Sequence, residues 1–226
     1  MNQKDNLIKS QDEELIFKNV SFSWNGDNKN ILNQCNFSIK AKGLWMIVGR
    51  NGCGKSTIFK LIKGILKPTK GYILAPKDTS LVFQNPDHQI LMPTCGSELI
   101  LNIKENLSRK DIAEKVSESL KSVGLDGFYK RPVHTLSGGQ KQRLAIASAL
   151  ISGNQFILMD EPTALLDEIS QSNILSIIKK LINKTLKPIT VLWITHRLEE
   201  LEYADYVASM NNGKLSSWQK PSKFKR

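Results

Sequence analysis

The residues best suited to chemistry lie in one glycine-rich stretch, which has the composition of a loop that binds phosphate groups. It reads Gly49-Arg50-Asn51-Gly52-Cys53-Gly54-Lys55-Ser56-Thr57. Its glycines let the chain curl so that successive backbone N–H groups point inward, where they can bind an anion. Lys55 can reach the β- and γ-phosphates of a nucleotide, and the Ser56 hydroxyl is a hard oxygen ligand suited to Mg²⁺. The stretch therefore predicts a site for a nucleoside triphosphate and Mg²⁺.

The residues on either side of this stretch fit a loop between a strand and a helix. Leu44 to Val48 form a continuous apolar run that predicts a buried strand, and Ile58, Leu61 and Ile62 predict an apolar helix face. Strand, glycine loop and helix is the order that a phosphate-binding loop requires. The alternative is a glycine-rich turn that contains a lysine by chance, and the flanking pattern argues against it.

A second group of reactive residues follows the apolar run from Phe156 to Met159. The run ends in Asp160 and Glu161, and consecutive strand residues point to opposite sides, so we expect different roles for the two carboxylates. Asp160 is suited to bind Mg²⁺, and Glu161 is suited to polarise an attacking water. The alternative is an acidic pair that merely faces solvent, which would be the better interpretation if the glycine-rich loop were absent.

Together with further motifs, these residues make the sequence resemble the ATP-binding subunits of ABC transporters. The motifs are most similar to those of the energy-coupling-factor importers of the cobalt, nickel and vitamin type. The resemblance runs from about Leu15 to about Leu215. Besides the loop and the acidic pair, it includes, in the order of the family, Trp24, Gln84, the signature Leu136-Ser137-Gly138-Gly139-Gln140, Asp167 and His196. It implies an α/β P-loop ATPase of ABC type. Such a fold has a mostly parallel core sheet flanked by helices, a small antiparallel β subdomain and an inserted helical subdomain at residues 87–135.

The resemblance also implies roles for residues that mean little alone. Trp24 would stack on adenine, with Phe22 as the competing candidate. Gln84 would contact Mg²⁺ and the attacking water and would couple the nucleotide state to a membrane subunit. His196 would hydrogen-bond the γ-phosphate, although a single histidine after an apolar run is more often a structural residue.

The signature implies a second ATPase subunit as a partner. Ser137, Gly138, Gly139 and Gln140 stand at the start of an expected helix, so their N–H groups and the helix dipole suit a phosphate. By resemblance, that phosphate belongs to ATP held by the facing subunit, and Asp167 contacts the same subunit. The chain carries one cassette, so the partner is expected to be a second copy or a paralogue.

The function implied by the resemblance is MgATP hydrolysis that drives uptake of a small substrate, a metal ion or a vitamin, through integral membrane subunits. The ATPase is then expected to be peripheral, at the cytoplasmic face of the plasma (inner) membrane. The alternative is a soluble ABC ATPase without a transporter, such as one serving iron–sulfur cluster assembly. The sequence from Gln84 to Gln89 favours the importer.

Composition agrees with one intracellular nucleotide-binding domain over residues 1–226. The chain is 40% hydrophobic, and its three cysteines, Cys35, Cys53 and Cys95, have no metal-ligand spacing. No segment approaches the roughly 18 apolar residues needed to span a bilayer. The net charge is +11, with an acid-free basic tail at 214–226. We interpret this excess of positive charge as a feature that favours solubility or attraction to an anionic membrane face. We expect no specific nucleic acid partner.

Periodicity predicts the remaining elements. Residues 14–39 are typical of strands joined by a polar turn at 25–28, and a helix is expected between Ser108 as its N-cap and Gly124 as its stop. Another helix is expected from Glu168 to Lys184. The segment from Lys55 to Gln84 is short, so the antiparallel subdomain is expected to be trimmed. Arg197 stands where the family frequently has an aspartate, and sequence reasoning offers no mechanism for that difference.

Overall fold

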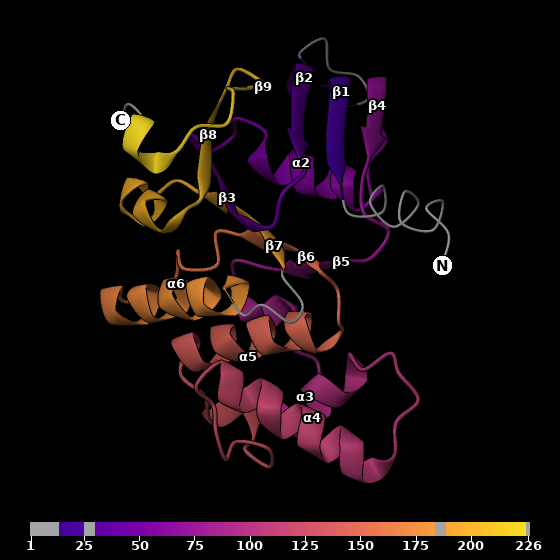
Figure 1. The fold of residues 1–226 in the computed structure, drawn as a ribbon, viewed down its shortest axis with the longest axis vertical. Helices are drawn as coiled ribbons and strands as arrows, with labels where there is room; N and C mark the ends of the chain where they lie inside the picture. The colour runs from indigo at the N-terminus through magenta and orange to yellow at the C-terminus, as the bar shows by residue number, and fades with distance from the viewer. Residues whose placement is uncertain (1–13, 25–29, 184–188, 225–226) are drawn as a thin grey trace. The chain divides into compact units, whose positions relative to one another are not determined.

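The structure is a computed structural model that describes residues 14–24, 30–183 and 189–224. The chain divides into two compact units (Figure 1). The first consists of Met1–Thr79 and Thr190–Arg226, and the second consists of Ser80–Ile189. The predicted helical subdomain at 87–135 lies within the second unit.

A three-stranded antiparallel sheet forms one part of the first unit. Its order is β2-β1-β4, with β1 at Leu15–Phe22, β2 at Leu32–Ile39 and β4 at Lys70–Leu74. Leu15 pairs with Ile39 and Ile16 with Leu74, and both pairings are antiparallel. The small antiparallel β subdomain is therefore confirmed, and the short segment before Gln84 contributes β4 to it. The polar turn predicted at 25–28 lies outside the described residues.

Parallel strands form the other part of the first unit. Strand β3 (Gly43–Val48) pairs in parallel with β7 (Thr190–Thr195) and with β8 (Tyr206–Asn211), while β9 (Lys214–Leu215) pairs antiparallel with β8. Every residue of β3 and β7 is buried, as continuous apolar runs predict for parallel strands covered on both faces. Helix α2 (Lys55–Ile62) follows β3, and the 3₁₀ helix η3 (Leu198–Tyr203) follows β7.

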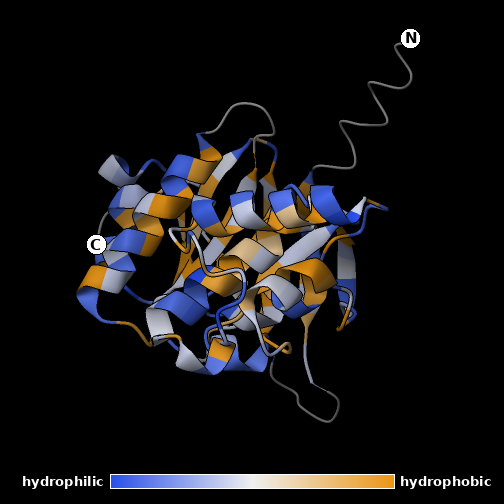
Figure 2. Cartoon of the chain, turned by 90° about the horizontal axis from the view of Figure 1, so that it is seen from below, coloured by the Kyte–Doolittle hydropathy of each residue, from blue (hydrophilic) through white to orange (hydrophobic). Residues whose placement is uncertain are grey.

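The second unit is mainly helical around two neighbouring strands, β5 (Thr79–Val82) and β6 (Phe156–Asp160). Its helices are α3 (Cys95–Leu101), α4 (Arg109–Ser122), α5 (Gly138–Ile151) and α6 (Glu168–Ile182), with short 3₁₀ turns η1 (Pro86–His88) and η2 (Val133–Thr135). Helix α4 packs against α5, and α3 packs against both (Figure 1). Figure 2 shows hydrophobic and hydrophilic residues along the same helices, as amphipathic helices on a core require.

Local signals placed the ends of these helices. Ser108 caps α4 by accepting a hydrogen bond from Asp111 N, and Gly124 follows the helix with a φ of 72°. Helix α6 begins at Glu168 as predicted but ends at Ile182, with Asn183 as its C-cap. Lys184, where sequence reasoning ended that helix, lies outside the described residues.

Much of the basic tail, residues 214–226, packs within the first unit, of which it is a part. Trp218 lies edge-on to Trp45, with ring centroids 4.9 Å apart, and Val207 and Gln219 form a β-bridge. Lys220 Nζ lies 4.2 Å from the centroid of the Tyr206 ring. The segment ends, in its described part, with the 3₁₀ turn η4 (Pro221–Lys223). Among the described residues, no helix has the length and apolar character to cross a membrane.

Candidate functional site

The glycine-rich loop joins β3 to α2, so the predicted order of strand, loop and helix is confirmed. Gly54 is the N-cap of α2 and has a φ of 105°, a conformation that favours glycine. A Cβ on Gly49 would lie 2.7 Å from Met210 O and 2.8 Å from Cys53 Sγ, so a side chain does not fit there. The loop is thus a backbone cradle, which fits a bound triphosphate.

Lys55 lies inside this cradle. Its side chain is buried, and its Nζ donates hydrogen bonds to Gly49 O at 2.7 Å and to Arg50 O at 3.1 Å. The ammonium is therefore held against the loop at which phosphate groups are expected. Ser56, the expected Mg²⁺ ligand on the next position, is exposed.

The same unit brings His196 to the loop. Val48 at the end of β3 is in register with Thr195 at the end of β7, so the residues that follow each strand emerge at one edge of the sheet. They line a pocket of about 450 Å³ formed by Val48, Gly49, Arg50, Asn51, His196 and Leu198. The sequence expectation that the histidine and the loop serve one site agrees with this geometry.

The two aromatic candidates for adenine stacking differ in exposure. Phe22 is 5% exposed and belongs to the core, whereas Trp24 is 44% exposed. The two rings meet edge-on, with centroids 5.1 Å apart. Trp24 is the more exposed of the two rings, which supports it over Phe22, and Lys60 Nζ lies 5.9 Å from the centroid of its ring.

Two strand ends in the second unit carry the other predicted catalytic groups. Asp160 ends β6 and Glu161 follows it with a φ of 47°, a left-handed conformation that is uncommon outside glycine. Gln84 lies two residues beyond β5, and the backbone just before it is fixed because Phe83 O accepts a hydrogen bond from Gln142 Nε2 at 3.1 Å. Strained backbone of the kind seen at Glu161 occurs preferentially at functional sites.

The signature begins α5 as predicted. Ser137 is the N-cap and forms a capping box, in which Ser137 Oγ accepts from Gln140 N and Gln140 Oε1 accepts from Ser137 N. A Cβ on Gly139 would lie 2.8 Å from Ser170 Oγ, so packing requires a glycine there. A Cβ on Gly138 would meet only Leu166 Cδ2, at 3.7 Å, so packing within the unit does not explain this glycine.

Asp167 has a structural role within its own unit. It caps α6 and accepts hydrogen bonds from Ser170 N at 2.9 Å and from Ser170 Oγ at 2.7 Å. These bonds to Ser170 hold the pKa of the Asp167 carboxyl below its usual value. Its predicted contact with another subunit stays a prediction.

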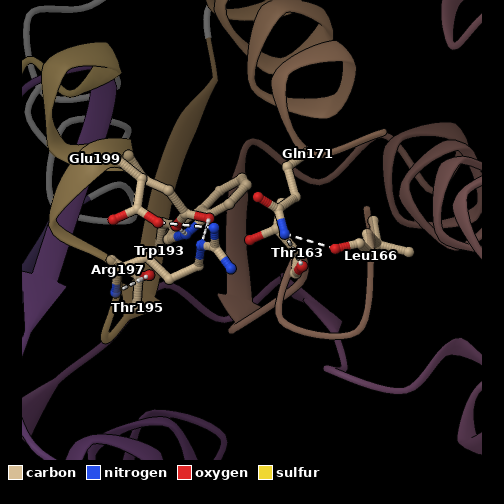
Figure 3. A network of polar contacts seen from close by, with 8 residues as sticks. Thr163, Leu166, Gln171, Trp193, Thr195, Arg197 and Glu199 are labelled. Carbon is tan, nitrogen blue, oxygen red and sulfur yellow. Dashed lines mark hydrogen bonds and ion pairs between the residues drawn. The ribbon is translucent and has the colours of Figure 1, made fainter. Parts of the chain in front are cut away.

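Sequence reasoning did not foresee two sets of contacts around these loops, both drawn in Figure 3. Gln171 Nε2 donates to Leu166 O at 2.6 Å and to Thr163 O at 3.3 Å, which fixes the loop before Asp167. In the first unit, Arg197 and Glu199 form an ion pair beside Trp193. A polar residue at the N-terminal turn of a predicted helix was the available signal for Gln171.

The phosphate loop between β3 and α2, the acidic pair at the end of β6 and the glycine-rich start of α5 define the class of protein: a P-loop ATPase of the ABC type. Residues 32–164 match the family model described as ABC transporter. The chain therefore belongs to the ABC transporter family and is an ATP-hydrolysing ABC ATPase.

Comparison with individual proteins agrees. The chain is 43% identical over 187 residues to "ABC transporter I family member 10" of Arabidopsis thaliana, covering 82% of this chain and 69% of that protein. It is 38% identical over 206 residues to the energy-coupling factor transporter ATP-binding protein EcfA of Methanocaldococcus jannaschii, covering 84% and 73%. A solved structure of cbiO1 from Clostridium perfringens, described as part of the ABC transporter complex cbiONQ, superposes with a TM-score of 0.85. That structure is 30% identical, and the match covers 92% of this chain and 89% of that one.

Proposed function

We propose that the chain is the ATPase subunit of an energy-coupling-factor importer, in which MgATP hydrolysis drives uptake of a small substrate. The observation that carries this proposal is the 33–38% identity to proteins named as energy-coupling factor transporter ATP-binding proteins, over 84–94% of this chain. The substrate classes proposed are metal ions and vitamins.

The first unit supplies the groups that bind and polarise the triphosphate. Trp24 stacks on adenine, and the loop amides and Lys55 stabilise charge on the γ-phosphate. Lys55 Nζ exchanges its bond to Gly49 O, 2.7 Å long, for phosphate oxygens. His196, on the wall of the same pocket, hydrogen-bonds the γ-phosphate.

The second unit supplies the groups that act on water. Glu161 accepts a proton from the attacking water and so raises its nucleophilicity. Gln84 orients that water. Ser56, Asp160 and Gln84 are the proposed ligands of Mg²⁺, which when bound supplies charge neutralisation for the phosphate oxygens.

The signature serves a second ATPase subunit, a copy of this chain or a paralogue. Gly138 has open space at its missing Cβ apart from an ordinary contact to Leu166, which suits the approach of a phosphate from outside the chain. Asp167 contacts the facing subunit. Integral membrane subunits hold the pair at the cytoplasmic face of the plasma (inner) membrane, where the ATPase is peripheral.

Replacement of the proposed base tests the enzymatic part. We expect Glu161→Gln to lower turnover by about a hundredfold or more while ATP binding stays, because only the proton acceptor is lost. Glu118→Gln, an exposed position on α4, is the matched control and should keep the wild-type rate. Near-normal turnover in Glu161→Gln contradicts the assignment.

Fractionation of cells tests the transport part. An importer subunit should co-purify in detergent with integral membrane proteins, and mass spectrometry of the complex identifies them. Recovery only in soluble complexes with iron–sulfur scaffold proteins would instead establish the alternative function. ATP hydrolysis is expected in either case, so this experiment separates transport from catalysis.

A further inference from the structure

A charged cluster in the first unit is formed by Arg197, which directly follows the pocket residue His196, and by two glutamates. Arg197 Nη2 lies 2.7 Å from Glu199 Oε1, and Arg197 Nε lies 3.7 Å from Glu200 Oε1. Trp193 Nε1 donates a hydrogen bond to Glu200 Oε2 at 3.1 Å. The three residues Arg197, Glu200 and Trp193 are called the Arg197 clamp below, and Figure 3 shows Arg197 beside Trp193 and Glu199.

Burial distinguishes the two glutamates. The side chain of Glu199 is 63% exposed, whereas that of Glu200 is 2% exposed. An exposed ion pair contributes little because water screens it. A buried carboxylate is costly unless it is paired and hydrogen-bonded, so Glu200 depends on the cation of Arg197 and on the indole of Trp193. Glu200 is therefore the buried partner of Arg197, although the contact of Arg197 with the exposed Glu199 is shorter.

The backbone connects the contacts of Arg197 to the position of His196, the residue before it. Arg197 is extended, with a φ of −94° and a ψ of 115°, so neighbouring side chains point to opposite sides. His196 and Leu198 both line the pocket with the phosphate loop, while Arg197 between them reaches the clamp. Arg197 N also donates to Thr195 Oγ1 at 3.0 Å, which fixes the segment at the end of β7.

We propose that Arg197 and Glu200 are positioning residues that hold His196 against the phosphate loop. The proposal rests on the proposed role of His196 at the γ-phosphate. It also explains the arginine that replaces the frequent aspartate, because the charge of Arg197 faces away from the nucleotide pocket and toward a buried carboxylate.

Steady-state kinetics of the full-length chain with its co-purifying partners tests the proposal. Arg197→Ala and Glu200→Gln should each lower kcat about tenfold, because a small displacement of a group at the reacting phosphate is costly, while KM for ATP changes by less than about twofold. Glu200→Gln keeps an oxygen for Trp193 and removes only the charge. Glu199→Gln is the matched control and should stay within about twofold of wild type.

A double-mutant cycle separates positioning from a general structural role. In a His196→Ala background, Arg197→Ala should lower single-turnover hydrolysis by less than about twofold, since the group it positions is gone. The same tenfold loss in both backgrounds overturns the proposal. The double variant Arg197→Met with Glu200→Gln removes both charges and should fold, yet should keep the low kcat. Wild-type kcat in that variant also overturns the proposal.

Histidine NMR provides a readout independent of turnover. The chain has three histidines, so the ring signal of His196 can be told from those of His88 and His134. Arg197→Ala and Glu200→Gln should shift and broaden the His196 signal, and Glu199→Gln should leave it in place, with the other two histidines unchanged. An unchanged His196 signal in both clamp variants refutes positioning. Absence of hydrolysis in the wild-type complex would refute the proposed function instead.

Discussion

Two helices of this chain begin at glycine-containing motifs that we propose bind phosphate, and their first turns are built in different ways. Helix α2 in the first unit begins after Gly54, which has a left-handed backbone conformation and forms no side-chain cap. Helix α5 in the second unit begins after Ser137. In a capping box, the side chains of Ser137 and Gln140 each accept a hydrogen bond from the backbone N–H of the other residue. The start of α2 has no side-chain cap, while at the start of α5 side chains of the described residues accept from the N–H groups of Ser137 and Gln140 but not from those of Gly138 and Gly139.

The difference suggests how each helix start acts. At α2, the glycines are required by the unit itself, because a Cβ on Gly49 or Gly54 would lie under 3.0 Å from the nearest atoms of other residues. At α5, Gly139 is required by Ser170, but Gly138 has no close neighbour. Packing within the first unit therefore accounts for the glycines at the start of α2, whereas packing within the second unit accounts for Gly139 but not for Gly138.

The largest effect is expected for Gly54→Ala. Its Cβ would lie 2.9 Å from Met210 Cε and 3.2 Å from Ile31 O, on a backbone with a φ of 105°. Such strain costs on the order of 1–3 kcal/mol, and the loop relieves it by moving. We expect ATP binding and turnover to fall by about a hundredfold or more, measured with a fluorescent ATP analogue and by phosphate release.

Gly64→Ala is the control for that prediction. Gly64 follows the other end of α2 with a φ of 68°, and a Cβ there would meet nothing within 4 Å. It should lower stability by roughly 1–2 kcal/mol, because an L-residue is strained in the left-handed region, and leave ATP binding unchanged. Equal losses of binding in both variants would mean that Gly54 acts through stability alone, which would remove the distinction between the two helix starts.

A smaller effect, confined to activity, is expected for Gly138→Ala. An added methyl group meets only Leu166 Cδ2 at 3.7 Å, and alanine favours the helix, so the melting temperature should stay the same or rise slightly. Turnover of the dimeric assembly should fall by about tenfold to a hundredfold because the methyl group blocks the approaching phosphate. Gly139→Ala, which clashes with Ser170, should lower both quantities. Wild-type turnover in Gly138→Ala would contradict the partner site.

The elements at both helix starts could be predicted because their signals are local. The apolar run of β3, the face of α2 and the Ser108 cap of α4 each depend on residues within a few positions. Packing contacts between distant residues could not be predicted from local patterns. The burial of Glu200 against Trp193 and the packing of Trp218 on Trp45 depend on tertiary packing that no periodicity encodes.

A third, smaller effect tests the cap of α5 itself. Ser137→Ala removes the oxygen that accepts from Gln140 N, and loss of such a cap costs about 1 kcal/mol. We expect a lower midpoint in chemical denaturation with an unchanged denaturant slope. Ser137→Asn, which retains a capping oxygen, should recover most of the loss. An unchanged midpoint in Ser137→Ala would mean that the capping box does not stabilise this helix start.

The smallest effect concerns Asp167, which caps α6 as Ser137 caps α5 but carries a charge. Its pKa is lowered from 3.8 by the hydrogen bonds from Ser170, so the stabilisation is fully present above that value and is lost as the pH falls through the lower folded-state pKa. Asp167→Ala should lower the melting temperature slightly at pH 7 and by a smaller amount in acid, where the protonated carboxyl still caps the helix but without its charge. Asp167→Asn keeps a neutral cap, so its melting temperature should lack this contribution to the pH dependence. If the difference between wild type and Asp167→Asn does not change below about pH 4, the ordinary range of an aspartate, the charged cap makes no net contribution and the two caps are equivalent.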